Sequence, residues 1–307
     1  PENNQQTTMK SLKDTWLYYL LKPLSLLPMG CLFALSDGLI YPVVYHLVGY
    51  RRKVVRANLF NAFPDWSEAE RKHVEKRFYR HFCDSFMEMI KVLSMSSEEA
   101  GRRMRFLNAE VVTDFAAKNQ GVLVVLGHYG NWEYQPFLFF HMLKHGNQQG
   151  YSVYRPLKSR AFDYLYQRIR TRFNGNVVTK EDTYRLVVRL RRDNIPGVFG
   201  LVSDQSPSRN NLNYWTSFLN QDTAILTGPE RMARQTGFAI VFADVSKVKR
   251  GYYQTRYICL TDQPKAEPEN ALTERYARLM EASILRDPAY WLWTHKRWKH
   301  KRPEQTN

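Results

Sequence analysis

Apolar runs alternate with amphipathic segments from about residue 120 onward. Short apolar runs predict buried strands, at Val122–Leu126, Tyr151–Tyr154, Asn176–Val178, Gly197–Val202, Phe238–Val245 and Tyr252–Leu260. Helical periodicity in the intervening segments predicts helices, at Asn131–Lys144, Ser159–Phe173, Asp182–Arg191, Gly228–Thr236 and Pro268–Leu285. Strands that alternate with helices predict an α/β fold, with one domain built on a mostly parallel central sheet flanked by helices.

The most apolar region, Trp16 to Tyr50, lies before this alternation. Lys22, Asp37 and Arg51 divide it, prolines interrupt it, and basic residues lie on both sides. A single span with a charge bias is basic mainly on its cytoplasmic side, so the pattern favours a helical segment that lies in one leaflet with both ends on the same face. The alternative is a pair of core helices. We therefore predict a disordered leader at residues 1–8, a membrane-associating segment at 9–50 and an α/β domain at 51–302.

Helix-start signals support parts of this assignment. Ser67 and Glu70 have the spacing of a capping box, and the apolar positions that follow predict a helix with one buried face. Thr227 and Glu230 have the same spacing, with a proline near the start. We predict that both boxes are structural.

Composition narrows the class of protein. The 307 residues carry a net charge of +16, which predicts an anionic partner such as a lipid surface, an acidic substrate or nucleic acid. The three cysteines are far apart in the sequence and form no CxxC pair. They predict no disulfide framework and no metal site, and we expect all three to be buried.

The stretch L-G-H-Y-G-N-W-E, Leu126 to Glu133, carries the first candidate chemistry. A histidine with an acid five residues later is expected by chance alone in a chain with 8 histidines and 29 acids, so position is what matters. His128 follows a predicted strand, where open α/β sheets bind ligands. Asn131 is a candidate cap for the next helix. The turn at the two glycines would then bring Glu133 to the imidazole, whose other nitrogen can accept a proton.

Three further segments join this candidate site. Arg155, in Y-R-P-L-K, follows a predicted strand and suits a phosphate or carboxylate. Asp204 and Gln205, in G-L-V-S-D-Q, follow another strand, although an Asx turn is a simpler explanation for Asp204. The tail from Arg286 to Arg302 mixes basic and aromatic residues, which is typical of single-strand nucleic-acid binding and of a bilayer interface alike.

These segments together resemble the lipid A biosynthesis acyltransferase family, the late lauroyl/myristoyl acyltransferases of Gram-negative bacteria. The resemblance extends over about residues 16–299, in an order and spacing that match. Its motifs are Y-R-R-K-V-V-R-A-N-L-F-N-A-F-P at Tyr50–Pro64, G-H-Y-G-N-W-E at Gly127–Glu133, Y-R-P-L-K at Tyr154–Lys158, S-D-Q-S-P at Ser203–Pro207, F-L-N-Q-D-T-A-I-L-T-G-P at Phe218–Pro229 and P-A-Y-W-L-W-T-H-K-R-W-K at Pro288–Lys299.

The resemblance implies a membrane-associated O-acyltransferase at the cytoplasmic face of the inner membrane. It would move a fatty acyl chain from an acyl thioester, on acyl carrier protein or CoA, to a hydroxyl of a lipid A precursor, an anionic lipid. His128 would be the catalytic base and Glu133 its acidic partner. Arg155, Asp204 and Gln205 would bind substrate, and no metal or other cofactor would be needed.

Two alternatives stay open on the sequence. The same chemistry suits another acceptor, such as a lysophospholipid, an aminolipid or a glycolipid. A different class, a non-enzymatic basic protein that binds nucleic acid, rests on charge and the tail alone. The family resemblance favours no nucleic-acid partner, and no helix-turn-helix, RRM or zinc pattern is visible.

Overall fold

The fold is that of an α/β protein with a mostly parallel sheet, as predicted. The computed structural model describes residues 12–142 and 149–302. Seven strands form one sheet in the order β1-β9-β8-β2-β5-β3-β4, and every neighbouring pair is parallel except β8 and β9. The strands are β1 (Met104–Phe106), β2 (Val122–Leu126), β3 (Gln149–Tyr154), β4 (Asn176–Thr179), β5 (Gly197–Val202), β8 (Ala239–Lys249) and β9 (Tyr252–Thr261).

Helices cover both faces of this sheet because the central strands are apolar on both sides. In β2, Leu123 and Val125 belong to one core cluster, whereas Val122, Val124 and Leu126 belong to another. The first cluster includes side chains of α8 (Arg160–Arg170), α9 (Lys180–Arg192), α10 (Gly228–Thr236) and α11 (Ala271–Arg286). The second includes side chains of α6 (Glu110–Thr113), η3 (Asp114–Lys118) and α7 (Leu138–Met142). Continuous apolar strands of this kind are typical of buried parallel sheets.

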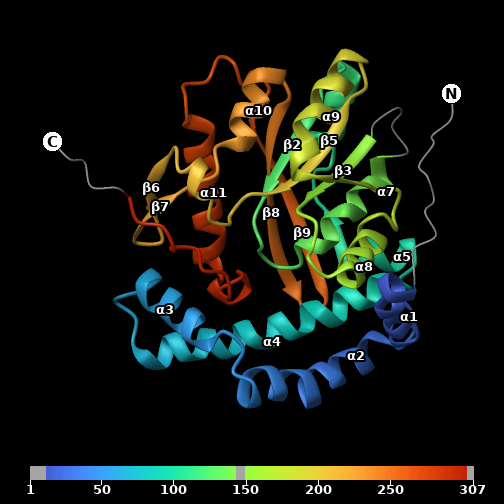
Figure 1. Ribbon diagram of the computed structural model, residues 1–307, viewed down its shortest axis with the longest axis vertical. Coiled ribbons are helices and arrows are strands. Elements are labelled where there is room, and N and C mark those ends of the chain that lie inside the picture. Colours follow the sequence, from blue (N-terminus) through green and yellow to red (C-terminus); the bar gives the residue numbers. More distant parts are fainter. Residues whose placement is uncertain (1–11, 143–148, 303–307) are drawn as a thin grey trace.

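A long helix, α4 (Glu68–Val92), lies across one end of the sheet (Figure 1). Its capping box of Ser67 and Glu70 is present, as predicted. It buries charged residues as well as apolar ones, notably Glu75, Asp84 and Glu88. The predicted apolar stripe on α4 is therefore only part of what this helix buries.

The N-terminal helices form an outer layer on the side of α4 that faces away from the sheet (Figure 1). This layer consists of α1 (Leu12–Ser25), α2 (Met29–Leu35) and the wider helical turns η1 (Ser36–Ile40) and η2 (Pro42–Leu47), and α3 (Arg52–Ala62) follows. Leu17, Leu32 and Tyr45 are buried against the rest of the protein. The 19 residues Met29–Leu47 are long and apolar enough to cross a membrane, and only 17% of an 18-residue window within them is buried.

Three local predictions are wrong. The segment after His128 begins with 3-10 turns, η4 (Trp132–Phe137), which contain Pro136, and only then becomes α7. Thr227 makes no side-chain cap, and Glu230 accepts hydrogen bonds from Thr273 at the start of α11 instead. Cys83 is buried, but Cys31 and Cys259 are exposed. The predicted leader, residues 1–8, lies outside the described residues, as do the last two residues of the predicted helix Asn131–Lys144.

Several elements were not predicted. They are α3, β1, α6 and η3, the short helix α5 (Ser97–Arg103), the antiparallel hairpin of β6 (Trp215–Phe218) and β7 (Gln221–Ala224), and the turns η6 (Arg209–Asn211) and η7 (Pro288–Tyr290). The strands of the hairpin are short and largely polar, so they lack the apolar signal that identified the central sheet.

Candidate active site

The candidate site lies where β2 and β5 end side by side. These parallel strands pair Leu126 with Val202, so the residues that follow them, His128 and Asp204, are brought to the same edge. Gly127 allows this approach. A Cβ at that position would lie 2.3 Å from the sulfur of Met280 and 3.2 Å from an oxygen of Asp204. A larger residue at 127 would separate the two strand ends from α11.

Asp204 is the carboxylate that contacts His128. Its Oδ1 lies 2.6 Å from His128 Nδ1, and its Oδ2 accepts the backbone N–H of His128 at 2.8 Å and the indole N–H of Trp291 at 2.7 Å. Burial opposes ionisation of Asp204, but the contacts with His128 and Trp291 outweigh it and lower its pKa to about 2. An ionised Asp204 requires the proton of a neutral His128 to sit on Nδ1, so Nε2 carries the free electron pair.

The predicted pairing of His128 with Glu133 is wrong. Arg170 on α8 grips Glu133 with two hydrogen bonds, Nε to Oε2 at 2.9 Å and Nη2 to Oε1 at 2.6 Å. Glu133 sits in the 3-10 turns of η4, whereas the prediction assumed an α-helix that started at Asn131. Sequence reasoning missed Arg170, because no motif marks one arginine of an amphipathic helix as the partner of a residue 37 positions earlier.

Gln205 and Arg155 differ in their distance from the imidazole. Gln205 Nε2 lies 3.2 Å from His128 Nε2, so its amide can donate to the free electron pair. Arg155 is exposed in the loop after β3, a strand separated from β2 by β5. It does not line the cavity described below. The structure therefore brings together His128, Asp204 and Gln205, keeps Glu133 nearby on Arg170, and leaves Arg155 outside.

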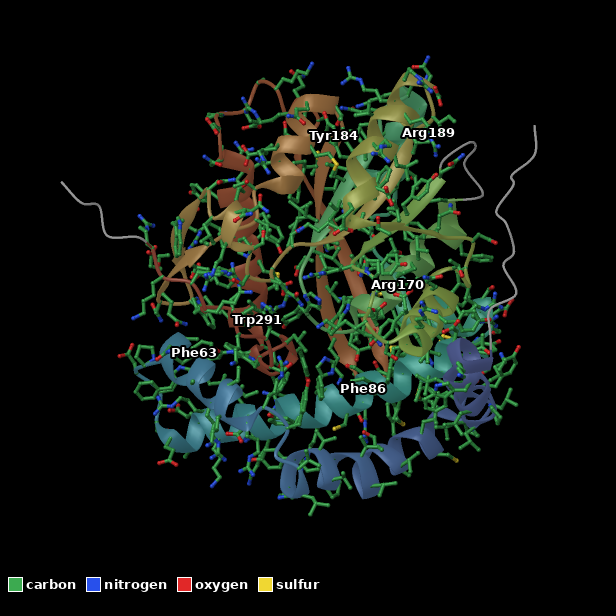
Figure 2. The ribbon with its side chains drawn as sticks, in the orientation of Figure 1. Phe63, Phe86, Arg170, Tyr184, Arg189 and Trp291 are labelled. Atoms are coloured by element: carbon green, nitrogen blue, oxygen red, sulfur yellow. The ribbon has the colours of Figure 1, made fainter. Side chains whose placement is uncertain are left out.

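A cavity of about 300 Å³ lies next to two residues that contact His128, although His128 itself does not line it. Its wall includes Gln205 and Trp132, whose ring packs edge-on against His128 with the ring centres 4.9 Å apart. The polar side chains of the wall include Asn131, Glu133, Thr294 and His295. Its apolar side chains come mainly from α4 and the segment before α3, and they include Tyr50, Phe78, Phe82, Phe86 and Met89. In Figure 2, Phe86 lies on α4, and Trp291 and Arg170 lie closer to the sheet.

Buried polar groups of α4 hold the loop that follows His128. Glu88 accepts a hydrogen bond from Asn131 at 2.7 Å, so Asn131 is not the predicted helix cap. His81 Nε2 lies 3.2 Å from the carbonyl oxygen of Gly130, and Lys247 lies 3.3 Å from its Nδ1. Burial raises the pKa of Glu88 to about 7, whereas burial and the charge of Lys247 hold the pKa of His81 well below its ordinary value. Buried side chains of α4 therefore fix the loop through hydrogen bonds.

The basic and aromatic tail has a different role from either one that its composition predicts. Trp293 is fully buried, and its indole donates to the carbonyl of Pro288. Trp298 donates to Thr223, and Trp291 to Asp204. The chain around Trp291 also pairs with Tyr129, and Leu292 donates its N–H to the carbonyl of His128 at 3.0 Å. These tryptophans are thus directed into the protein, and Trp291 is part of the cavity wall.

Comparison with known proteins agrees with this geometry. The bacterial lipid A biosynthesis acyltransferase family matches residues 3–300. The chain belongs to this family. It is 24% identical to a lipid A biosynthesis lauroyltransferase of Escherichia coli K12 over 277 residues, which cover 86% of this chain and 87% of that protein.

Two further relatives carry related names. A lipid A biosynthesis acyltransferase of Haemophilus influenzae is 24% identical over 300 residues, 95% of this chain and 93% of that protein. A lipid A biosynthesis palmitoleoyltransferase of Escherichia coli K12 is 22% identical over 262 residues, 81% of this chain and 79% of that protein. This member of the family is accordingly an acyltransferase of lipid A biosynthesis, and the alternative of a non-enzymatic nucleic-acid-binding protein is set aside.

Proposed function

We propose that the protein transfers a fatty acyl chain from an acyl thioester, with acyl carrier protein as the donor, to a hydroxyl of a lipid A precursor. The observation that carries the proposal is the His128–Asp204 pair, whose Nε2 contacts Gln205 in the wall of a cavity lined by polar and apolar side chains. A thioester donor needs a base for the attacking hydroxyl and a donor for the oxyanion, and both can be protein groups. The reaction then needs no metal and no cofactor other than the thioester.

The acceptor hydroxyl loses its proton to His128 Nε2 as its oxygen attacks the thioester carbonyl. Asp204 stabilises the imidazolium that forms, in the way a buried carboxylate does in catalytic triads. Collapse of the tetrahedral intermediate breaks the C–S bond, and the thiolate takes the proton from His128. Gln205, which donates to Nε2 in the free protein, occupies the direction from which the hydroxyl must approach. The substrate hydroxyl therefore replaces Gln205 as the hydrogen-bond donor to Nε2.

We propose that Glu133 binds the acceptor instead of acting as the partner of His128. Its carboxylate lines the cavity and Arg170 fixes it there, which suits a group that accepts a hydrogen bond from the acceptor sugar or lipid headgroup. We assign Arg155, which is exposed beyond the rim, to a phosphate of the acceptor or donor. The apolar wall of α4 suits the acyl chain, since each buried methylene contributes about 0.8 kcal/mol.

The outer helical layer supports attachment to the cytoplasmic face of the inner membrane. Nine of the eighteen exposed large hydrophobic side chains among the described residues fall between residues 16 and 50. They are Trp16, Tyr19, Leu20, Leu26, Leu27, Leu39, Leu47, Val48 and Tyr50. An apolar surface of this kind, on a protein with a net charge of +16, suits an anionic lipid surface and an acidic carrier protein.

Lipid mass spectrometry tests the proposal. A Gram-negative host that lacks its own late acyltransferases would express the wild type, His128→Ala, or His73→Ala, which changes an exposed histidine of α4. We expect lipid A one acyl chain heavier with the wild type and with His73→Ala, and its absence with His128→Ala. A heavier species in some other lipid would replace the acceptor in the proposal. An unchanged lipid profile with well-expressed wild type would overturn it.

A further inference from the structure

His295 is a second histidine in the cavity wall, and several contacts fix its position. Its backbone carbonyl accepts hydrogen bonds from Asn58 Nδ2 and from the N–H of Arg297, both at 2.9 Å. Its backbone N–H donates to Leu292, the residue that is itself bonded to the carbonyl of His128. The ring is therefore attached to the same strand end as the base.

The contacts of His295 also determine where its proton lies. Nε2 accepts the backbone N–H of Ser206 at 3.2 Å. A nitrogen that accepts is unprotonated, so a neutral ring carries its proton on Nδ1. Burial lowers the pKa of His295 to about 4, which keeps the ring neutral at physiological pH. In the part of the chain that the structure describes, no group accepts a hydrogen bond from Nδ1.

One turn of chain contacts both histidines. Gln205 Nε2 lies 3.2 Å from Nε2 of His128, and the N–H of the next residue, Ser206, lies 3.2 Å from Nε2 of His295. A base and a neutral N–H donor are thus held on two consecutive residues at one cavity. A neutral imidazole is an effective electrophile in enzymes because it donates without bringing a charge that must be desolvated.

Three other donors in the cavity wall already have partners. The amide of Asn131 donates to Glu88, and the indole of Trp291 donates to Asp204. Arg51 donates to the carbonyl of Thr294 at 3.0 Å and is exposed, so water competes for its remaining protons. Among these groups, His295 alone is both fixed and left with an unused donor.

We propose that His295 donates its Nδ1 proton in a hydrogen bond to the carbonyl oxygen of the acyl thioester and stabilises the oxyanion of the tetrahedral intermediate. This inference rests on the proposed acyl transfer. The attack forms a C–O bond, the carbonyl π pair moves to the oxygen that His295 contacts, and the hydroxyl proton moves to His128. When the C–S bond breaks, the oxygen pair returns to carbon, and His295 keeps its proton throughout.

A matched pair of substitutions separates catalysis from support of the turn. The amide of His295→Asn can place an N–H near the former Nδ1, but it does not reach Ser206. The amide of His295→Gln can reach Ser206 with its oxygen, but it places no donor at the former Nδ1. Donation to the oxyanion therefore predicts more activity in Asn than in Gln, whereas a supporting role for the Ser206 contact predicts the reverse order.

The assay uses purified full-length protein in detergent, lauroyl-acyl carrier protein and a lipid A precursor from a host without late acyltransferases. For His295→Gln we expect kcat to fall by about 10²–10³-fold with KM for the thioester nearly unchanged. For His295→Asn we expect a kcat about tenfold or more above that of His295→Gln. The inference is overturned if His295→Gln is as active as His295→Asn or more active, or if the substitutions change only KM. No transfer by the wild type to this or any other lipid defeats the proposed function itself, and the inference with it.

Discussion

Two carboxylates near His128 have different partners, and each partner defines a role. Asp204 contacts the imidazole and an indole N–H, whereas Glu133 contacts the guanidinium of Arg170. In the sequence, one acid lies five residues after His128, and the other follows a different predicted strand. The sequence does not say which strand ends meet, because the β2–β5 pairing depends on tertiary packing.

Asp204→Asn is the sharpest test of this division. The substitution keeps the size of the side chain but removes the charge that stabilises the imidazolium, and it allows the wrong tautomer of His128. We expect kcat to fall on the order of 10³-fold with the melting temperature changed by only a few degrees. Glu133→Gln in the same assay should be milder in kcat and stronger in KM for the acceptor. A larger kcat loss for Glu133→Gln than for Asp204→Asn would reverse the assignment.

Acid should reduce the stability of the fold through His295. Burial lowers its pKa to about 4, although Asp204 opposes this shift and Arg297 adds to it. The unfolded chain therefore binds more protons than the folded one between about pH 6.5 and pH 4, so stability is lost as pH falls through that range. For this partly exposed ring we expect about 1 to 2 kcal/mol.

The check is chemical denaturation of the wild type and His295→Gln at pH 7 and pH 4.5. The gap between their free energies of unfolding should shrink at the lower pH, because the variant lacks the group that titrates. A gap that stays constant would mean that His295 remains protonated to the same extent in both states.

At the scale of the element, α4 contributes both to the apolar wall of the cavity and to the contacts that hold the loop after His128. Phe78, Phe82, Phe86 and Met89 line the cavity, and His81 and Glu88 bond the loop. The apolar stripe was predicted as plain core because helical periodicity reports a buried face without saying whether protein or ligand covers it. The burial of polar residues on α4 was not predicted, because the sequence does not distinguish a buried glutamate from an exposed one.

Met89→Trp should shift the preferred acyl chain toward shorter donors. Met89 is 5% exposed and lines the cavity, so a larger ring there removes space for the chain. Loss of two methylene sites at about 0.8 kcal/mol each corresponds to roughly tenfold in selectivity. Competition between lauroyl and myristoyl thioesters measures the ratio, with Phe60→Trp, at an exposed site on α3, as the control. An unchanged ratio in Met89→Trp would place the chain elsewhere.

Other elements show where sequence reasoning succeeds and fails. The bounds of β2, β5 and α10 agree with the prediction, because their ends carry sharp signals: glycines, a proline or a change from apolar to polar residues. The predicted start of the helix after His128 is wrong because the loop residues make tertiary contacts instead. Asn131 turns to Glu88, and Gly130 adopts a φ of +60°, where a Cβ would lie 3.0 Å from Val245.

On the scale of the whole molecule, half of the exposed large hydrophobic side chains among the described residues lie between residues 16 and 50, in the N-terminal helices. Leu47 and Val48 are 81% and 64% exposed at the end of these helices. Figure 2 shows Tyr184 on α9 at the far end of the molecule from α2. The molecule therefore has one end suited to an apolar surface and an opposite end that offers a control.

The double substitution Leu47→Asp and Val48→Asp should weaken binding to anionic lipid vesicles by at least about tenfold, because it removes two apolar contacts and adds negative charge. Co-sedimentation with vesicles of mixed phosphatidylethanolamine and phosphatidylglycerol measures the effect. Tyr184→Asp and Val188→Asp, which alter charge equally on α9, should leave more of the binding intact. Equal losses in the two variants would indicate an effect of net charge alone.

The closure of the site by residues 291–295 has a consequence for biosynthesis. The ribosome makes the apolar segment that ends near Tyr50 about 240 residues before it makes Trp291, which bonds Asp204. At roughly 5 to 20 residues per second, translation separates the two by about 10 to 50 s. Nascent chains stalled before residue 291 should consequently expose their apolar segment while they remain unable to turn over any thioester, so anchoring would precede catalysis in the life of each molecule.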